Sequence, residues 1–306
     1  MIQDPNVKKV DLKLYMASRR ELIDKALETY IPKESAYPYV IHQAMRYSVF
    51  AGGKRLRPIL TLAAAEAVGG DPASVLFAGC AVELIHTYSL IHDDLPAMDN
   101  DDFRRNKPTS HKVFGENMAI LAGDALLTLA FEVLSRPENL KTFKADILLS
   151  VIREISLAAG TLGMIGGQVM DILSEGRKEI NANTLEYIHT HKTGKLLLAS
   201  LRAGALLAGA TEEQLKAITD YGTYIGLCFQ IVDDILDVEG TTEEIGKDAG
   251  SDAAREKATY PALYGLDRSK GLARELAKKA IQALSGFGES AQPLREIGEF
   301  IVSRTY

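Results

Sequence analysis

Apolar residues recur at three- and four-residue spacing along most of the chain, and Ala and Leu are the commonest among them. This period places apolar side chains on one face of an α-helix. No run shows the strict alternation of Val, Ile, Thr and aromatic residues that a half-buried strand requires. The pattern therefore predicts an all-α fold, with about ten to twelve helices separated by proline and glycine.

Acidic residues follow two of the apolar stretches. The segments 88–94 (YSLIHDD) and 228–234 (CFQIVDD) share one design, in which an apolar helix runs into paired carboxylates. Acidic residues on facing helices are how a metal site is built inside a helical bundle. We therefore expect these two helix ends to face each other across a cavity.

The spacing of the carboxylates differs between the two clusters. Asp233 and Asp237 are four residues apart and share one helical face, whereas Asp234 is turned about 100° away. Asp93 and Asp99 are six apart and could not share a face of an unbroken helix. Pro96 disfavours helical geometry at the preceding residue, so we predict that the helix ends near Asp94 and that Asp99 returns from the following turn.

So many carboxylates at apolar helix ends repel one another unless a cation is present. Mg²⁺ fits best, because it commonly bridges a few carboxylates to substrate phosphates. For one acidic run alone, such as 99–102 (DNDD), a solvated acidic loop would be the better explanation. Two runs that both follow apolar helices favour a Mg²⁺ site.

Basic residues accompany the acidic clusters. The segment 52–58 (GGKRLRP) combines flexible backbone with three cations, and Arg supplies the planar fork that grips phosphate oxygens. Arg104 and Arg105 follow the first acidic cluster at once. A diphosphate chelated to Mg²⁺ would need both signs of charge in one place.

Two further positions stand out within helical stretches. Gly194 costs about 1 kcal/mol relative to Ala in a helix, which predicts either a kink that turns backbone carbonyls toward a ligand or a close helix contact. His86 lies seven residues before Asp93, on roughly the same helix face. A buried core histidine and a ligand contact both remain open for it.

Composition and charge limit the class of protein. The net charge of −6 argues against a nucleic-acid partner. Cys80 and Cys228 lack paired-ligand spacing and lie in apolar runs, which predicts buried thiols. The N-terminus has no export-signal pattern, and the apolar stretches 119–134 and 196–210 contain charged residues. We therefore expect a cytoplasmic protein without a membrane span.

In its ordered motifs the chain closely resembles bacterial farnesyl diphosphate synthases of the trans-prenyltransferase family. The resemblance runs nearly end to end and implies a single isoprenoid synthase domain over residues 1–306, with the helices around a central cavity. It rests on segments 52–58 (GGKRLRP), 92–99 (HDDLPAMD) with Arg104-Arg105, 123–127 (GDALL), 166–171 (GGQVMD), 192–194 (KTG), 229–230 (FQ) with 233–237 (DDILD), and 257–261 (KATYP). One departure is Asn106, where the family usually has Gly, and we expect it to perturb the loop backbone at Arg105.

The resemblance also implies roles for individual residues. Three Mg²⁺ ions would be held on the allylic diphosphate by the carboxylates Asp93, Asp99, Asp233 and Asp237. The same diphosphate would be bound by Arg104, Lys192, Thr193, Gln230, Lys247 and Lys257. Isopentenyl diphosphate would be bound by Gly53, Lys54, Arg57, His86 and Arg105. The catalytic group would be Lys192, Thr193 and Gln230, whose oxygens stabilise an allylic cation, and the family suggests a homodimer.

Product length is expected to depend on the helix before Asp93. Ser89 lies one turn beneath that carboxylate and is small, whereas Tyr88 lies about 7.5 Å back along the axis. A ring at this depth would stop a growing tail. In the family, an aromatic residue here with a small neighbour marks farnesyl producers, so the resemblance implies farnesyl diphosphate.

Other functions remain as alternatives. The chain could be a geranylgeranyl diphosphate synthase, or a metal-dependent phosphohydrolase that uses His86, His92 and Asp93. A phosphohydrolase leaves the second acidic cluster and the basic motifs unexplained, and a terpene cyclase would not need the 52–58 segment. A non-catalytic partner subunit of the same fold is a further possibility, against which the intact acidic motifs argue.

Overall fold

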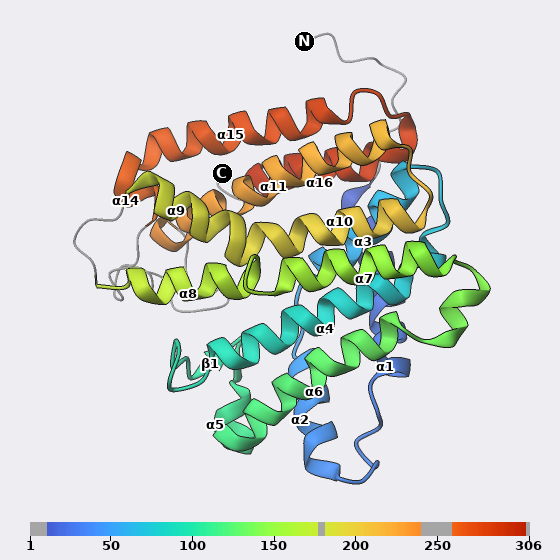
Figure 1. The fold of residues 1–306 in the computed structure, drawn as a ribbon. Coiled ribbons are helices and arrows are strands. Elements are labelled where there is room, and N and C mark those ends of the chain that lie inside the picture. Colours follow the sequence, from blue (N-terminus) through green and yellow to red (C-terminus); the bar gives the residue numbers. More distant parts are fainter. Residues whose placement is uncertain (1–10, 177–180, 240–258, 304–306) are drawn as a thin grey trace.

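The computed structural model describes residues 11–176, 181–239 and 259–303, and within these ranges the chain is almost entirely helical (Figure 1). The all-α prediction is confirmed. The α-helices are α1 (Leu12–Tyr30), α2 (Tyr39–Val49), α3 (Leu56–Ala67), α4 (Leu76–Asp93), α5 (Ser110–Phe114), α6 (Glu116–Leu134), α7 (Ala145–Ala159), α8 (Met164–Ser174), α9 (Ala182–Ile188), α10 (Lys195–Leu207), α11 (Glu212–Glu239), α14 (Tyr260–Tyr264), α15 (Leu266–Ala283) and α16 (Gln292–Ser303). Single turns are η1 (Pro72–Val75), η2 (Pro137–Lys141) and η4 (Glu289–Ala291), and η3 (His189–Gly194) is a π-helix.

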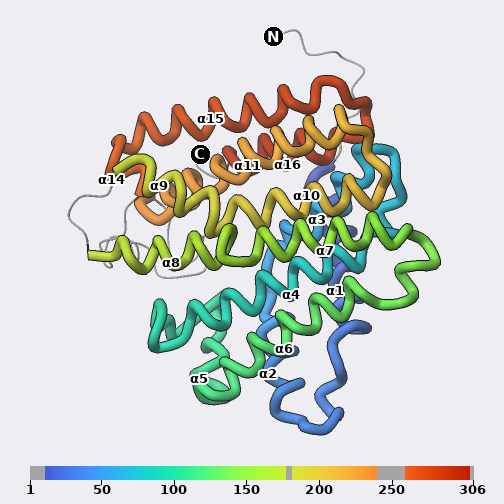
Figure 2. Tube along the Cα trace, viewed as in Figure 1, coloured from blue at the N-terminus to red at the C-terminus, as the bar shows by residue number. Residues whose placement is uncertain are grey.

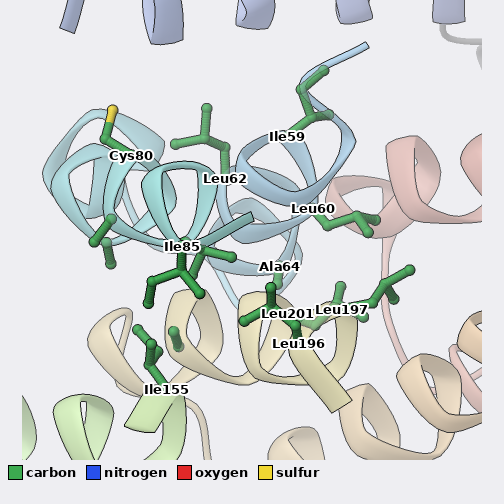
Figure 3. Close-up of a cluster of buried hydrophobic side chains, with 14 of the residues drawn as sticks. Ile59, Leu60, Leu62, Ala64, Cys80, Ile85, Ile155, Leu196, Leu197 and Leu201 are labelled. Carbon is green, nitrogen blue, oxygen red and sulfur yellow. The ribbon is translucent and has the colours of Figure 1, made fainter. Parts of the chain in front are cut away.

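Helices α3 and α4 form the centre of the core, because they are buried on nearly all sides. Both are apolar around most of their circumference, which is typical of a helix inside a protein. Figure 3 shows side chains from α3, α4, α7 and α10 gathered there, among them Ile59, Leu62, Cys80, Ile85, Ile155 and Leu201. Cys80 and Cys228 are both buried and unbridged, as predicted.

The two helices that carry the acidic motifs end on the same side of the molecule. Figures 1 and 2 show α4 and α11 running in the same direction, α4 toward β1 (Phe103–Arg104) and α11 toward α14. Between them lie α3 and α10, which pack against α4 and, in the case of α10, also against α11. The core therefore fixes the relative positions of the two acidic ends.

The strands of the described residues are β1 and its antiparallel partner β2 (Lys107–Pro108), in which Arg104 pairs with Lys107. Their two-residue connection places Arg105 at φ 54° and Asn106 at φ 60°. A tight hairpin of this kind needs positive φ at both central residues, and Asn tolerates that region better than other non-glycine residues. Asn106 therefore takes up a left-handed backbone shape that Gly also allows, and the expected perturbation of the loop stays a prediction.

Three helical stretches are long and apolar enough to cross a membrane by length and composition alone: Pro72–Asp93, Glu116–Lys141 and Ala145–Ser174. The second contains residues 119–134. Because charged residues break this stretch, we expected it not to span a membrane. Pro72–Asp93 is largely covered by protein, with 72% of its most apolar window buried. The other two windows are only 44% and 39% buried, so apolar side chains remain on the surface there.

Candidate active site

The end of α4 has the geometry that Pro96 predicts. The helix stops at Asp93, and Asp94 follows as its C-terminal cap. The chain then turns back, and the backbone N–H of Asp99 donates to the carbonyl oxygen of Asp93 at 2.8 Å. This single hydrogen bond brings the two carboxylates proposed as metal ligands to the same turn.

The two aspartates at the end of α4 are held in different ways. Burial raises the pKa of Asp93 to about 6, and the carboxylate of Asp99 adds to the rise. Burial also raises the pKa of Asp94 to about 6, although Arg104 opposes it. The Nε atom of Arg104 donates to Asp94 at 2.7 Å, so Asp94 holds the arginine, whereas Arg104 acts on Asp93 through its charge.

The second acidic motif lies in the last turns of α11. Asp233 is partly exposed, whereas Asp234 and Asp237 are only 6% and 4% exposed. Gln230 lies about one turn earlier and is partly exposed as well. The side chains that the sequence assigned to this end therefore differ in access to solvent, with Asp233 and Gln230 the more open.

Each acidic end lies near a basic group from another element. Asp93 and Asp99 both raise the pKa of Lys192, and Asp233 acts in the same direction on Arg57, although burial lowers the pKa of both cations. These couplings place η3 near the end of α4 and the 52–58 segment near the end of α11, so the four elements approach one another in one region, which we call the common space. The structure thus brings together the acidic and basic residues that the sequence analysis paired.

The donor set fits Mg²⁺ only in combination with a substrate. Within the described ranges, no group of three or more His, Cys, Asp and Glu side chains is close enough to hold a metal ion by itself. Mg²⁺ is usually bound by one or two carboxylates together with substrate phosphates and water. Burial raises the pKa of Asp93, and a divalent ion beside this carboxylate would favour its charged form.

The 52–58 segment forms a loop that leads into α3. Gly53 has φ 115°, and a Cβ atom there would lie 2.6 Å from Cζ of Arg105. Arg105 donates to the carbonyl oxygen of Gly52, so its guanidinium lies flat against the loop in space that only Gly leaves open. Lys54 is exposed at the tip of the same loop. Gly53, Lys54 and Arg105 are therefore brought together, as the sequence analysis expected.

Arg57 and His86 lie beneath this loop in a strongly cationic pocket. Burial lowers the pKa of Arg57, and the neighbouring Arg105 lowers it further. Burial likewise lowers the pKa of His86 well below its ordinary value, with Arg57 and Arg105 acting in the same direction. Nε of Arg57 is buried without a hydrogen-bond partner among the described residues. Unsatisfied donors and crowded cations are the features of an anion site.

The π-helix η3 carries Lys192, Thr193 and Gly194, where the sequence predicted a kink or a close contact. A π-turn widens the helix and is frequent at functional sites. Nζ of Lys192 donates to Asp171 of α8 at 2.6 Å. A Cβ atom at Gly167 would lie 2.1 Å from the backbone nitrogen of Lys192, so α8 and η3 are in direct backbone contact. The irregularity predicted at Gly194 is therefore a π-helix, and Gly194 also makes a close helix contact, since a Cβ atom at Gly226 of α11 would lie 3.2 Å from its Cα atom.

Tyr88 lies inside α4 and is 6% exposed. Its ring meets that of His92 edge to face, with centroids 5.7 Å apart. His92 is in turn hydrogen-bonded through Nε2 to the carbonyl oxygen of Ile120 on α6 at 3.0 Å. Ser89 donates its hydroxyl to the carbonyl oxygen of His86. Tyr88 is thus fixed between two helices below the acidic turn.

Sequence reasoning missed a buried ion-pair network next to the cationic pocket. Arg55 is 3% exposed and donates to Glu83 at 2.9 Å and to Asp24 at 2.8 Å. It also donates to the carbonyl oxygen of Val49. A signal was present, because Glu83 is the one charged residue in the otherwise apolar run 76–85. A lone acid inside a buried helix needs a cationic partner.

Two of the residues assigned to allylic diphosphate binding, Lys247 and Lys257, lie outside the described residues. Their roles stay predictions. The other assigned positions all lie on the elements that surround the common space: α3 and its preceding loop, α4, the β1–β2 hairpin, η3 and α11.

Comparison with known proteins agrees with this geometry. The polyprenyl synthetase family model matches residues 38–294. A dimethylallyltranstransferase of Fischerella ambigua is 50% identical over 95% of this chain and 83% of its own length. A geranylgeranyl diphosphate synthase of Cyanophora paradoxa is 46% identical over 96% of this chain and 97% of its own. The crystal structure of an FPP/GFPP synthase from Zymomonas mobilis superposes with a TM-score of 0.86 at 38% identity, covering 96% of this chain and 100% of that one. The chain therefore belongs to the polyprenyl synthetase family and is a short-chain trans-prenyltransferase.

Proposed function

We propose that the protein is a Mg²⁺-dependent farnesyl diphosphate synthase, which condenses isopentenyl diphosphate with dimethylallyl and then geranyl diphosphate. The observation that carries the proposal is the meeting of two kinds of anion site around one space. One is a cationic pocket with an unsatisfied donor on Arg57. The other is a carboxylate turn at Asp93 and Asp99 beside the cations Lys192 and Arg104. A reaction between isopentenyl diphosphate and an allylic diphosphate would need both the cationic pocket and the carboxylate turn.

Each of the two sites binds a different substrate. The cationic pocket of Gly53, Lys54, Arg57, His86 and Arg105 takes isopentenyl diphosphate directly, because several cations surround a buried guanidinium nitrogen that has no hydrogen-bond partner among the described residues. The carboxylates Asp93, Asp99 and Asp233, with Asp237, take the allylic diphosphate through Mg²⁺. When bound, the metal neutralises the departing diphosphate.

Residues of this chain then control the reactive centre. Lys192 and Arg104 hold the allylic diphosphate while its C–O bond breaks. Backbone oxygens near Lys192 and Thr193, and the side-chain oxygen of Gln230, face the allylic cation and stabilise it. The double bond of isopentenyl diphosphate attacks this cation, and a proton passes to the released diphosphate. No side chain has to act as a strong base.

The function is tested by incubating the purified protein with labelled isopentenyl diphosphate and each allylic starter, with Mg²⁺ and with chelator. We expect a longer prenyl diphosphate that forms only with the metal, because grouping two diphosphates requires divalent cations. Release of inorganic phosphate without a longer product would support the phosphohydrolase instead. Inactivity under all conditions would support a non-catalytic partner subunit.

We infer farnesyl diphosphate as the product from the position of Tyr88. Its ring is buried and held against His92 below the acidic turn, so it obstructs the path along α4. Geranylgeranyl diphosphate is the second candidate, because several of the similar curated proteins are named geranylgeranyl synthases.

Tyr88→Ala is expected to lengthen the product beyond fifteen carbons, because removing the ring opens space below Ser89. Tyr88→Phe is the matched control, since it keeps the ring and loses only the hydroxyl. Product chromatography after dephosphorylation measures both. Unchanged chain length in Tyr88→Ala, or a wild-type product that already has twenty carbons, would contradict the assignment.

We propose that the protein forms a homodimer through α6, α7 and α8. Large apolar side chains are exposed on these neighbouring helices and on the turn between α7 and α8: Ile120, Leu121, Leu149, Leu157, Leu162, Ile165, Val169, Ile172 and Leu173. Exposed apolar side chains on adjoining helices are a feature of association sites. Sedimentation equilibrium tests the proposal, and a monomer at micromolar concentration would reject it.

A further inference from the structure

Asp234, the second aspartate of the α11 motif, is engaged differently from its neighbours. Its carboxylate is 6% exposed, and one oxygen, Oδ2, accepts two hydrogen bonds. Nε2 of His189 lies 2.8 Å from it, and the backbone nitrogen of Tyr260 lies 2.9 Å from it. One buried carboxylate oxygen therefore joins three elements: α11, the π-helix η3 and α14.

The histidine in this cluster is fixed on two sides. Its Nε2 carries the proton that it donates, because the facing carboxylate can only accept. Its ring stacks on that of Tyr260, with centroids 5.4 Å apart and planes 27° apart. His189 is 6% exposed, and its Nδ1 has no hydrogen-bond partner among the described residues. The imidazole is thus held in one orientation by Asp234 and Tyr260.

The hydrogen bond between His189 and Asp234 matters because His189 begins the π-helix that carries two proposed catalytic residues. His189 is the first residue of η3, and Lys192 and Thr193 lie in the same π-helix. A π-turn is a rare and locally unfavourable backbone form that surrounding contacts must stabilise. On one side, α8 touches the backbone of Lys192 and Asp171 binds its Nζ. On the other side, the hydrogen bond from His189 to Asp234 ties the start of the turn to α11.

We propose that Asp234 and His189 are positioning residues that hold the π-turn, and through it Lys192 and Thr193, in the geometry required for allylic ionisation. Asp234 does this as a hydrogen-bond acceptor, and it is not a Mg²⁺ ligand. The inference rests on the proposed function, since Lys192 and Thr193 act on the allylic substrate only in that mechanism. A displacement of about 1 Å in such groups can cost about 10²-fold in rate.

The charge of Asp234 and its hydrogen bonds can be separated by substitution. In Asp234→Asn, the amide oxygen can still accept from both His189 and the Tyr260 nitrogen, whereas the charge is lost. In Asp234→Ala both contacts are lost. His189→Gln keeps a donor for Asp234, and His189→Leu removes it. Asp220→Asn is the control, because Asp220 lies on the same helix but pairs with Lys216 near the surface.

We expect the two Asp234 variants to differ in kcat. We expect Asp234→Ala and His189→Leu to lower kcat about 10- to 100-fold. We expect Asp234→Asn and His189→Gln to stay within about fivefold of wild type, with the Mg²⁺ concentration at half-maximal rate nearly unchanged. The control variant should match wild type. If Asp234→Asn is as damaging as Asp234→Ala and needs far more Mg²⁺, the carboxylate binds metal and the proposal is wrong.

Hydrogen exchange supplies a measurement that does not depend on turnover. In the metal-free protein, Asp234→Ala should speed exchange of the amides in 189–194 and of Tyr260, whereas the core amides of α4 should keep their protection. Equal acceleration throughout would mean general destabilisation and would overturn the positioning role. If wild type makes no prenyl product, the proposed function fails, but the exchange data still decide whether Asp234 holds the π-turn.

Discussion

Asp93→Asn is expected to abolish prenyl transfer while making the metal-free protein more stable. Burial and the nearby carboxylate of Asp99 raise the pKa of Asp93 from 3.8 to about 6. The folded chain therefore binds this proton more tightly than the unfolded chain does, and ionisation costs stability as the pH rises from about 4 to about 6. The full cost is present at pH 7. A neutral amide avoids it and is close in size to the carboxyl.

The two effects of this substitution have different magnitudes. At pH 7.5 in chelator, we expect the free energy of unfolding to rise by about 1–3 kcal/mol, since one pKa unit corresponds to about 1.4 kcal/mol. With Mg²⁺ and substrates, kcat should fall by about 10²–10³-fold, because a charged group that stabilises the departing diphosphate is lost. The ionised carboxylate of Asp93 would then lower the stability of the metal-free protein while it supports catalysis.

Denaturant unfolding at pH 5 and pH 7.5 measures the first effect. The gain in stability should be smaller at pH 5, where Asp93 of the folded wild type is largely protonated. Asp102→Asn is the matched control, because Asp102 is exposed and pairs with Lys112 on the surface. We expect it to change stability by less than about 0.5 kcal/mol. A loss of stability in Asp93→Asn at pH 7.5 would show that the charge is already compensated in the metal-free protein.

How far the sequence predicts this site depends on the range of the interactions involved. The return of Asp99 to Asp93 was predicted, because a proline restricts the residue before it and the turn spans only a few residues. The grouping of Gly53 with Arg105 was predicted only through resemblance to a family, since 52 residues separate them. The π-turn was foreseen as an irregularity at Gly194, but no local rule distinguishes a π-turn from a bend.

Contacts between distant buried polar groups were beyond sequence reasoning. His189 and Asp234 are 45 residues apart, and Arg55 and Glu83 are 28 apart. Each residue alone can be explained in several ways, because a charge or an imidazole can be exposed, paired or bound to a ligand. Only the packing of α3, α4, η3 and α11 decides between these explanations. The sequence shows that a partner is needed and does not identify it.

The Arg55–Glu83 pair leads to the largest expected loss of stability. Glu83 is 2% exposed, and burial lowers the pKa of Arg55 while Glu83 and Asp24 raise it above its ordinary value. Glu83→Ala would leave a buried guanidinium with only one acidic partner, the partly exposed Asp24, besides the carbonyl oxygen of Val49. Breaking a buried ion pair by removing one partner typically costs about 3–5 kcal/mol. Denaturant unfolding at neutral pH measures this loss.

A double substitution distinguishes the loss of a pair from the loss of packing. In Arg55→Leu with Glu83→Leu, both charges are replaced by apolar side chains, so no buried charge is left without a partner. Such replacements are often neutral or stabilising, and we expect the double variant to regain much of the stability that Glu83→Ala loses. Glu21→Ala is the control, because the Glu21–Lys25 pair is fully exposed and should contribute little. A double variant less stable than Glu83→Ala would mean that packing, and not the unpaired charge, dominates.

The same pair also sets the shape of the cationic pocket, since Arg55 lies between Lys54 and Arg57 at the start of α3. Arg55 has φ 51°, an uncommon backbone form for a residue other than Gly. Glu83 and Asp24 hold the Arg55 guanidinium in place, and this fixes the backbone between Lys54 and Arg57. Glu83→Ala should therefore raise KM for isopentenyl diphosphate by more than it raises KM for the allylic starter. An equal rise for both substrates would assign the effect to the fold as a whole, because the carboxylate turn at the end of α4 does not depend on this loop.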